Sequence, residues 1–554
     1  MSNDVHFKFW PERLTKTLTV PETTLYDNLY VTAKRYPNKR AISYYGKDYT
    51  YRELFEEVEK VAAYLENELH VKKGDNILLF MQNSPQFLIS LFAILRVRAV
   101  VIPINPMSIT KDLEYYIKDA NITYALVSNE LYGKVKPLIE NNLIKRVIVT
   151  AYLEYIDEEK ALTKLPEEVI APLVEDDYII PWTEVIQYKG SPSSYEGEAD
   201  DVAMIPYTSG TTGKPKGCVH TNKTVQSNVL GAYHWMNMTS DSVILTTLPL
   251  FHVTGLVHTA LAPLYGGSEL VILTRWDKEY AIRAIETYRV THWINISTMV
   301  IDFLSNDKLK EYDLSSLVLV GGGGAPLPEA VGKKLKDATG LDYVEGYGLS
   351  ETMSHTHFNP PHRPKLQCLG IPAFGVDARI IDLETQEELG PNEEGELVVN
   401  GPQMFVEYYN NEEETEQGFI TIDGKKFFRT GDIVKRDEEG YYFIVDRLKR
   451  MINAAGFKVW PTEVESVLYN HPAINEACVI SAPDKIRGET VKAVVTLKND
   501  YKGKIKPEDL IDWTKDKLAN YKYPRIVEFR ESLPMTSSGK ILWRQLQEES
   551  YKGV

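Results

Sequence analysis

The chain has 554 residues, and at about 150 residues per domain that length predicts three to four folding units rather than one. A hydrophobic share of 43% with 25% charged residues excludes a disordered, collagen-like or coiled-coil chain. The 78 acidic and 62 basic residues give a net charge of −16, which repels a phosphate backbone, so we expect a small-molecule ligand and no nucleic acid partner.

The amino-terminal segment, residues 1–17, has no uninterrupted apolar core of the kind that a secretory signal contains. The most apolar stretch, residues 87–104, is broken by two arginines and a proline and falls short of the roughly 20 apolar residues that span a bilayer. It predicts a buried helix that runs into a buried strand. The three cysteines stand far apart, which disfavours a disulfide framework. We therefore predict a cytoplasmic protein without a membrane span.

Short apolar runs alternate with helical patterns through the first 320 residues. The runs are residues 76–81, 99–104, 124–127, 146–149, 243–248, 269–273 and 317–320. A helical pattern such as that of residues 51–69 lies between them. This alternation predicts βαβ units and mainly parallel sheets.

From about residue 375 the pattern changes to short strands separated by Gly, Asn and Asp turns, at residues 378–382, 396–399 and 441–445. Beyond Asp446 the chain has helical patterns at 461–470 and 507–518 and strand patterns at 477–481 and 491–497. The predicted fold class is α/β. It combines a large N-terminal domain (1–446) of parallel-rich sheets with helices, which includes a small β-rich subdomain (375–446), and a small mobile α+β C-terminal domain (447–554).

Hydroxyls, glycines and lysines concentrate in residues 207–217, after the apolar residues 202–205. Backbone N–H groups, hydroxyl donors and two ammonium groups suit a polyphosphate. The segment is not a Walker A loop, because Gly210 and Gly213 are too close together and Pro215 stands where that loop needs Ser or Thr. Residues 321–324 are no dinucleotide fingerprint either, because the third glycine of G-x-G-x-x-G is missing.

Residues 207–217 resemble the signature phosphate loop of the adenylate-forming superfamily of acyl-CoA synthetases, firefly luciferase and peptide-synthetase adenylation domains. Seven further motifs stand in the family's order, at residues 248–252, 322–326, 347–352, 429–432, 446–449, 456–458 and 534–540. The resemblance implies a reaction in two halves. A carboxylate attacks the α-phosphate of ATP to give acyl-AMP and pyrophosphate, and the thiol of CoA then displaces AMP.

The resemblance also implies roles for individual residues in ATP binding. We expect Thr208 and Glu351 to hold magnesium (Mg²⁺), Thr352 to donate a hydrogen bond to the α-phosphate, and Tyr347 to stack on adenine. The implied cofactor-binding set is Thr208, Ser209, Gly210, Thr211, Thr212, Gly213, Lys214, Lys216, Gly324, Ala325, Pro326, Gly346, Tyr347, Gly348, Thr352, Asp432, Ile444, Arg447, Gly456 and Lys458.

Within this set Asp432 is expected to accept hydrogen bonds from both ribose hydroxyls, because a carboxylate has two acceptor oxygens, with Arg447 assisting. Outside it, Lys540 is expected to bridge the attacking carboxylate and the α-phosphate as charge develops. The implied catalytic set is Lys540, Thr352, Glu351, His252 and Lys449.

A catalytic lysine on a small terminal domain could obstruct CoA, and the family resolves this conflict by domain alternation. Lys449 matches the hinge position. Rotation there would withdraw Lys540 and bring residues 456–458 to the site, where Gly456 permits a close approach by pantetheine.

The acyl pocket is expected to involve His252 and the segments around Gly346 and Gly348. Acetate-specific relatives carry a tryptophan at the step of Gly348, so glycine there indicates room for a medium-chain or longer fatty acid. An aryl or hydroxy acid is the alternative substrate. Alternative functions are transfer of the acyl group to a carrier protein, its oxidation, or nucleotide binding without catalysis. A homodimer is a further possibility that the sequence leaves open. A metal site at His355, His357 and His362 is disfavoured, since two prolines intervene.

Overall fold

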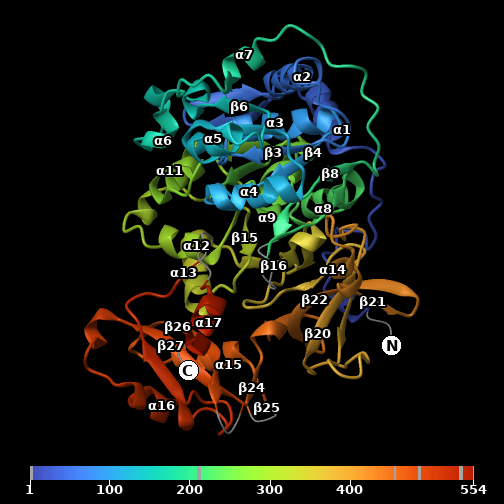
Figure 1. Ribbon diagram of the computed structural model, residues 1–554. Helices are drawn as coiled ribbons and strands as arrows, with labels where there is room; N and C mark the ends of the chain where they lie inside the picture. Colours follow the sequence, from blue (N-terminus) through green and yellow to red (C-terminus); the bar gives the residue numbers. More distant parts are fainter. Residues whose placement is uncertain (1–3, 209–213, 455–456, 485–487, 536–540, 553–554) are drawn as a thin grey trace. The chain divides into compact units, whose positions relative to one another are not determined.

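The computed structural model describes residues 4–208, 214–454, 457–484, 488–535 and 541–552. The chain divides into two compact units, coloured along the sequence in Figure 1. The first comprises Met1–Ala378, Val399–Phe428 and Glu438–Tyr442, and the second Arg379–Val398, Arg429–Asp437 and Phe443–Val554. The domain boundary expected at residue 446 stays a prediction.

The first unit contains a nine-stranded sheet in the order β18-β17-β16-β15-β14-β12-β13-β1-β2. Its strands are β1 (Arg40–Tyr44), β2 (Lys47–Thr50), β12 (Val243–Thr246), β13 (Glu269–Ile272), β14 (His292–Asn295), β15 (Leu319–Gly323), β16 (Tyr343–Leu349), β17 (Ser354–Phe358) and β18 (Ile371–Pro372). Neighbouring strands from β1 through β13, β12, β14 and β15 to β16 run parallel. Strands β17 and β18 continue the sheet antiparallel.

A seven-stranded sheet of the same unit has the order β11-β8-β4-β3-β5-β6-β7. Its strands are β3 (Asn76–Phe80), β4 (Val100–Pro103), β5 (Tyr124–Ser128), β6 (Arg146–Thr150), β7 (Ile179–Pro181), β8 (Val202–Met204) and β11 (His220–Thr221). All neighbours except β8 and β11 pair in parallel. The predicted apolar runs and their parallel pairing are thus confirmed.

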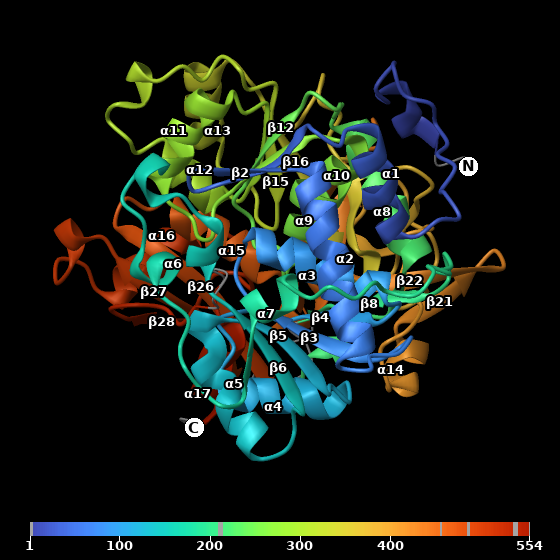
Figure 2. The ribbon, with the colours of Figure 1, turned by 90° about the horizontal axis from the view of Figure 1, so that it is seen from above.

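Helices cover both faces of the seven-stranded sheet (Figure 2). Side chains of β3 to β6 alternate between the faces, and those of Leu78, Phe80 and Val127 share one buried cluster with α4 (Thr110–Asp119) and α5 (Tyr132–Glu140). The helices α2 (Tyr51–Asn67) and α3 (Pro85–Arg96) lie over the other face (Figure 2). Every residue of α3 is buried and the helix leads into the buried strand β4, as predicted for residues 87–104.

The remaining α-helices of the first unit are mostly short. They are α1 (Leu25–Arg35), α6 (Glu167–Ile170), α7 (Trp182–Ile186), α8 (Asn222–Trp235), α9 (Val253–Leu256), α10 (Ala262–Gly266), α11 (Lys278–Tyr288), α12 (Ser297–Phe303), α13 (Glu329–Thr339) and α14 (Glu412–Gln417). Among the described residues, no helix combines the length and apolar character needed to cross a membrane.

The strands predicted between residues 375 and 446 are confirmed. They belong to a sheet of β19 (Asp377–Ile381), β20 (Gly395–Asn400), β22 (Lys425–Arg436), β21 (Phe419–Ile422) and β23 (Tyr442–Arg447). The sequence analysis missed the hairpin of β21 and β22. Its turn has φ 51° at Asp423 and 76° at Gly424, the two left-handed residues that a type I′ hairpin requires.

The second unit ends in a small α+β assembly, as predicted. Long antiparallel strands β26 (Ile474–Asp484) and β27 (Gly488–Leu497) are flanked by β24 (Ile452–Ala454), β25 (Phe457–Val459) and β28 (Ile526–Phe529). One face packs on α15 (Pro461–Tyr469) and α16 (Pro507–Lys515), and the other on α17 (Trp543–Lys552). Alternate side chains such as Val479 and Ile480 fill the two cores.

Candidate active site

The described ends of the phosphate loop form a short hairpin of β9 (Tyr207–Thr208) and β10 (Lys216–Gly217), with Thr208 opposite Lys216. The hydroxyl of Tyr207 donates to Asp119 at 2.6 Å, and that of Tyr115 donates to the carbonyl of Pro215 at 2.8 Å. These bonds fix the hairpin to α4. The loop residues Ser209, Gly210, Thr211, Thr212 and Gly213 lie outside the described residues.

The two lysines expected to bind phosphate have different surroundings. The Nζ atom of Lys214 lies 5.9 Å from the ring centroid of Tyr115. The Nζ atom of Lys216 forms an ion pair with Glu414 at 2.6 Å and lies 4.3 Å from the ring centroid of Tyr408. Lys216 therefore already has an anionic and an aromatic partner within the first unit.

The turn Ser350–Thr352 joins β16 to β17 and carries the expected metal ligand. The half-buried Glu351 accepts a hydrogen bond from the Tyr408 hydroxyl at 2.7 Å. The buried hydroxyl of Thr352 donates to the carbonyl of Ser354 at 2.8 Å, so it would have to exchange that partner to reach a phosphate. Met353 and Ser354 follow with φ 45° and 94°, a strained backbone of the kind found at ligand sites.

A segment that sequence reasoning missed, residues 405–409, connects this turn to the phosphate-loop hairpin. The N–H of Phe405 donates to the carbonyl of Glu351 at 2.8 Å. The N–H of Tyr409 donates to the carbonyl of Gly217 at 2.8 Å, and Tyr408 pairs with Cys218 in an antiparallel bridge. The sequence gives little local indication of this role, because residues 405–409 pair with parts of the chain that are far away in sequence.

Gly346, Tyr347 and Gly348 lie on β16, opposite Phe358, His357 and His355 of β17. A Cβ atom at Gly348 would lie 1.6 Å from the carbonyl oxygen of Ser354 and 2.6 Å from the Cα of His355. Glycine is therefore required by the close approach of the two strands. This is a second reason for glycine here, and the interpretation of Gly348 as an opened cap of the acyl pocket stays a prediction.

Replacing Gly348 by alanine is expected to lower the free energy of unfolding by about 3 kcal/mol, because β17 must move to admit the methyl group. The matched control is Gly133→Ala in α5, where nothing lies within 4 Å of the added Cβ and alanine is favoured in a helix by about 1 kcal/mol. Urea unfolding of both variants measures the difference. Equal stability of the two variants would contradict the close-approach argument.

The segment Gly324–Pro326 follows β15 and is held through backbone carbonyls. The Ser297 hydroxyl lies 3.1 Å from the carbonyl of Ala325 and 3.2 Å from that of Pro326. The next N–H, that of Leu327, donates to the buried Glu345 at 3.0 Å. Burial raises the pKa of Glu345 to about 7, against hydrogen bonds that lower it.

In the second unit the structure brings together the two residues expected at the ribose. The side chain of Asp432 on β22 is 1% exposed, and its Oδ1 lies 2.7 Å from Nε of Arg447 on β23. The N–H of Asp432 donates to the hydroxyl of Thr430, which donates to the carbonyl of Leu397. Ile444 lies on β23 as well. The backbone of Asp432 is thus held by Thr430, and its carboxylate is held by the guanidinium of Arg447.

The other expected site residues are placed as follows. His252 is exposed and begins α9, where its Nδ1 accepts from the N–H of Thr254 at 3.3 Å. Lys449 lies in the short 3-10 turn Leu448–Arg450. Lys458 on β25 forms an ion pair with Glu384 at 3.2 Å. Gly456 and Lys540 lie outside the described residues.

Buried histidines surround the β16–β17 turn. Nδ1 of His258 lies 3.1 Å from the carbonyl oxygen of Thr254, so that nitrogen carries the proton. Nε2 of His258 then accepts from Nδ1 of His355 at 3.0 Å. Nε2 of His220 lies 2.8 Å from the carbonyl of Ser350. The pair His258–His355 is thus neutral and bonded directly to one another.

Burial lowers the pKa to about 4 for His220 and His258 and to about 3 for His357, and it also lowers the pKa of the buried His292 and His355. They stay neutral in the native protein but take up protons when it unfolds below pH 6.5. Their contribution to the free energy of unfolding is therefore complete above pH 6.5. It falls as the pH drops towards 4, by about 1.4 kcal/mol per pH unit for each histidine.

Urea unfolding between pH 7.5 and 4.5 measures this proton uptake. We expect His357→Phe to reduce the slope of unfolding free energy against pH by about one proton below pH 6. The exposed His362 serves as the control, and His362→Asn is measured in the same way. Equal slopes for wild type and His357→Phe would contradict the assignment.

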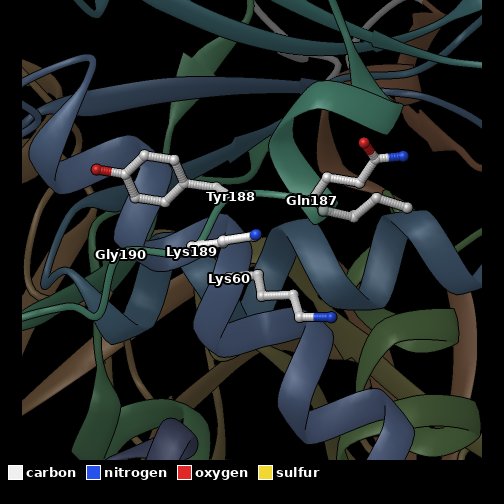
Figure 3. A pocket seen from close by; sticks show the side chains of 6 residues that line it. Lys60, Gln187, Tyr188, Lys189 and Gly190 are labelled. Carbon is white, nitrogen blue, oxygen red and sulfur yellow. The ribbon is translucent and has the colours of Figure 1, made fainter.

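A separate pocket of about 630 Å³ is lined by Lys60, Ile186, Gln187, Tyr188, Lys189 and Gly190 (Figure 3). The side chains of Lys60, Gln187 and Lys189 are exposed. None of the expected site residues lines it. This pocket is therefore distinct from the candidate site.

The residues present fit a magnesium ion that is bound partly by the protein and partly by phosphate oxygens. Among the described residues, no three His, Cys, Asp or Glu side chains converge as a metal cage. Mg²⁺ in phosphate-transfer sites typically takes one or two carboxylates together with substrate oxygens and water. The carboxylate of Glu351 would supply such a ligand, whereas the role of the Thr208 hydroxyl as a second ligand rests only on the resemblance.

The chain is similar to known proteins along most of its length. A family model for AMP-binding enzymes matches residues 29–409, and one for their C-terminal domain matches residues 463–540. A long-chain-fatty-acid–CoA ligase of Bacillus subtilis is 34% identical over 98% of this chain and 97% of its own length. A feruloyl-CoA synthase of Amycolatopsis is 30% identical over 92% and 96%. The ATP-bound structure of MatB from Rhodopseudomonas palustris superposes with a TM-score of 0.82 at 27% identity, covering 96% of this chain and 99% of that one.

Proposed function

The chain belongs to the family of AMP-binding enzymes, and from that premise we propose that it converts a carboxylic acid, ATP and CoA into acyl-CoA, AMP and pyrophosphate. The resemblance to adenylate-forming enzymes and the predicted fold class are confirmed by these matches. The chain is accordingly an AMP-forming acid–thiol ligase. The observation that carries this conclusion is the similarity over nearly the full length to curated fatty-acid–CoA ligases.

In the proposed first step the chain's residues bind and orient ATP. Glu351 offers a carboxylate that its neighbour Tyr408 holds by a hydrogen bond. Asp432 accepts from the ribose hydroxyls, and its ion pair with Arg447 orients the carboxylate. A bound Mg²⁺ would neutralise phosphate charge and so favour attack by an anion. Lys540 would stabilise the charge that develops between carboxylate and α-phosphate.

In the proposed second step the thiol of CoA attacks the acyl carbonyl and AMP leaves. Rotation about Lys449, and the approach of Gly456 and Lys458 to CoA, stay predictions, as do a cytoplasmic location and a homodimer. The acid is proposed to be a medium-chain or longer fatty acid, supported by the fatty-acid–CoA ligases among the relatives. An aryl acid is the second candidate, supported by the feruloyl-CoA synthase.

A substrate series tests the proposal. Acetate, octanoate, palmitate, benzoate and ferulate are each supplied with ATP and Mg²⁺, and pyrophosphate release is measured with and without CoA. We expect the highest kcat/KM for octanoate or palmitate and a thioester product that requires CoA. The highest value for ferulate would establish the second candidate, and pyrophosphate release without any thioester would refute CoA transfer.

A further inference from the structure

One oxygen of the Glu351 carboxylate already accepts a hydrogen bond. The hydroxyl of Tyr408 donates to Oε1 at 2.7 Å. Among the described residues, no hydrogen bond or ion pair involves Oε2 of Glu351. A ligand can therefore bind Oε2 without competing with an existing hydrogen bond.

Tyr408 is itself held on several sides. The ring is 5% exposed and lies beneath Nζ of Lys216, which Glu414 holds by an ion pair. The N–H of Tyr408 donates to the hydroxyl of Thr415 at 3.0 Å, and its backbone pairs with Cys218. The backbone bonds fix the start of the side chain, and the phenol cannot turn away from Glu351 without leaving Lys216 and its buried surroundings. Its position is set by the fold and does not depend on a bound ligand.

This arrangement bears on the choice of metal ion. Calcium takes six to eight oxygen ligands and readily accepts both oxygens of one carboxylate, whereas magnesium requires a near-ideal octahedron and binds a single carboxylate oxygen beside phosphate and water. An oxygen that already accepts a hydrogen bond from a phenol has one lone pair left, so chelation of calcium by both oxygens would compete with that hydrogen bond. Binding of magnesium through the other oxygen would not, so the phenol disfavours calcium more than magnesium.

We propose that Tyr408 is a positioning residue that favours one-oxygen coordination by Glu351 and thereby favours Mg²⁺ over Ca²⁺ in the ATP site. The proposal rests on the proposed role of Glu351 as a metal ligand. Tyr408 touches neither metal nor substrate in this role. It acts only through the orientation and occupancy of the Glu351 carboxylate.

The test compares Tyr408→Phe with Tyr409→Phe. Phenylalanine at 408 keeps the ring beneath Lys216 and removes only the hydroxyl. Tyr409 is the matched control, because its hydroxyl lies next in sequence but accepts from the side chain of Asn76 at 3.2 Å. Binding of N-methylanthraniloyl-ATP is followed by fluorescence while Mg²⁺ or Ca²⁺ is titrated, and thermal unfolding shows that each variant is folded.

We expect the ratio of half-saturating Ca²⁺ to Mg²⁺ concentrations to fall about tenfold in Tyr408→Phe and to stay unchanged in Tyr409→Phe, with metal-free nucleotide binding equal in all three proteins. An unchanged ratio in folded Tyr408→Phe, or equal weakening of both metals, would overturn the proposal. Pyrophosphate exchange by the wild type is measured separately. Its absence would refute the proposed function, while the metal ratio would still decide the role of Tyr408.

Discussion

Replacing Lys540 by alanine is expected to slow acyl-adenylate formation by about 10²-fold to 10³-fold while leaving thioester formation from supplied acyl-AMP nearly unchanged. The ammonium group is proposed to stabilise charge only in the first transition state, when an anion attacks a phosphate. In the second step the thiol attacks a neutral carbonyl, so the same cation has no charge of this kind to stabilise.

Two isolated half-reactions measure this difference. Exchange of pyrophosphate into ATP reports the first, and release of AMP from synthetic acyl-AMP and CoA reports the second. The control is Lys502→Ala, which removes an exposed lysine of the same unit that pairs with Glu531. Equal losses in both half-reactions for Lys540→Ala would show that the lysine supports the fold or a shared step instead.

Replacing Asp432 by asparagine is expected to weaken ATP binding by about 10-fold to 100-fold, because hydrogen bonds to a charged acceptor contribute about 1.5–3 kcal/mol. Asparagine keeps the shape of the side chain but removes its charge and one acceptor oxygen. The effect on folding is expected to be small, since the partner Arg447 has a side chain 42% exposed and can be hydrated.

Modified nucleotides separate a ribose contact from an indirect effect. Wild type is expected to bind 2′-deoxy-ATP and 3′-deoxy-ATP more weakly than ATP. In Asp432→Asn, loss of the 2′- or 3′-hydroxyl of ATP is expected to weaken binding little further, because the contacts to these hydroxyls are already weakened. This non-additivity identifies a direct interaction. Additive losses in variant and nucleotide would place the ribose away from Asp432.

The parallel sheets were predictable because their strands are buried on both faces. Residues 76–81 and 124–127 are therefore nearly continuous apolar runs, which stand out between helices. Strand β22 was missed for the opposite reason. It carries Lys425, Lys426 and Arg429 along its length, and only the Asp423–Gly424 turn marked the hairpin.

The site was predictable where one motif forms one local structure. Glu351 and Thr352 fall in a single turn, and Asp432 meets Arg447 through neighbouring strands of one sheet. Tyr408 was not predictable, because its pairing with Cys218 joins residues 190 positions apart and leaves no local pattern. The close approach at Gly348 was not predictable either, because a glycine beside a ligand and a glycine beside another strand look alike in sequence.

The ladder that joins residues 217–219 to residues 405–409 also limits how hybrid enzymes can be assembled from this chain and a relative. A crossover placed between residues 220 and 404 would take the two sides of the ladder from different parents. Backbone pairing tolerates such a junction, but the packing of Tyr408 beneath Lys216 depends on both parents. Crossovers after the helix α14 keep both sides, together with Glu351 and Glu414, from a single parent.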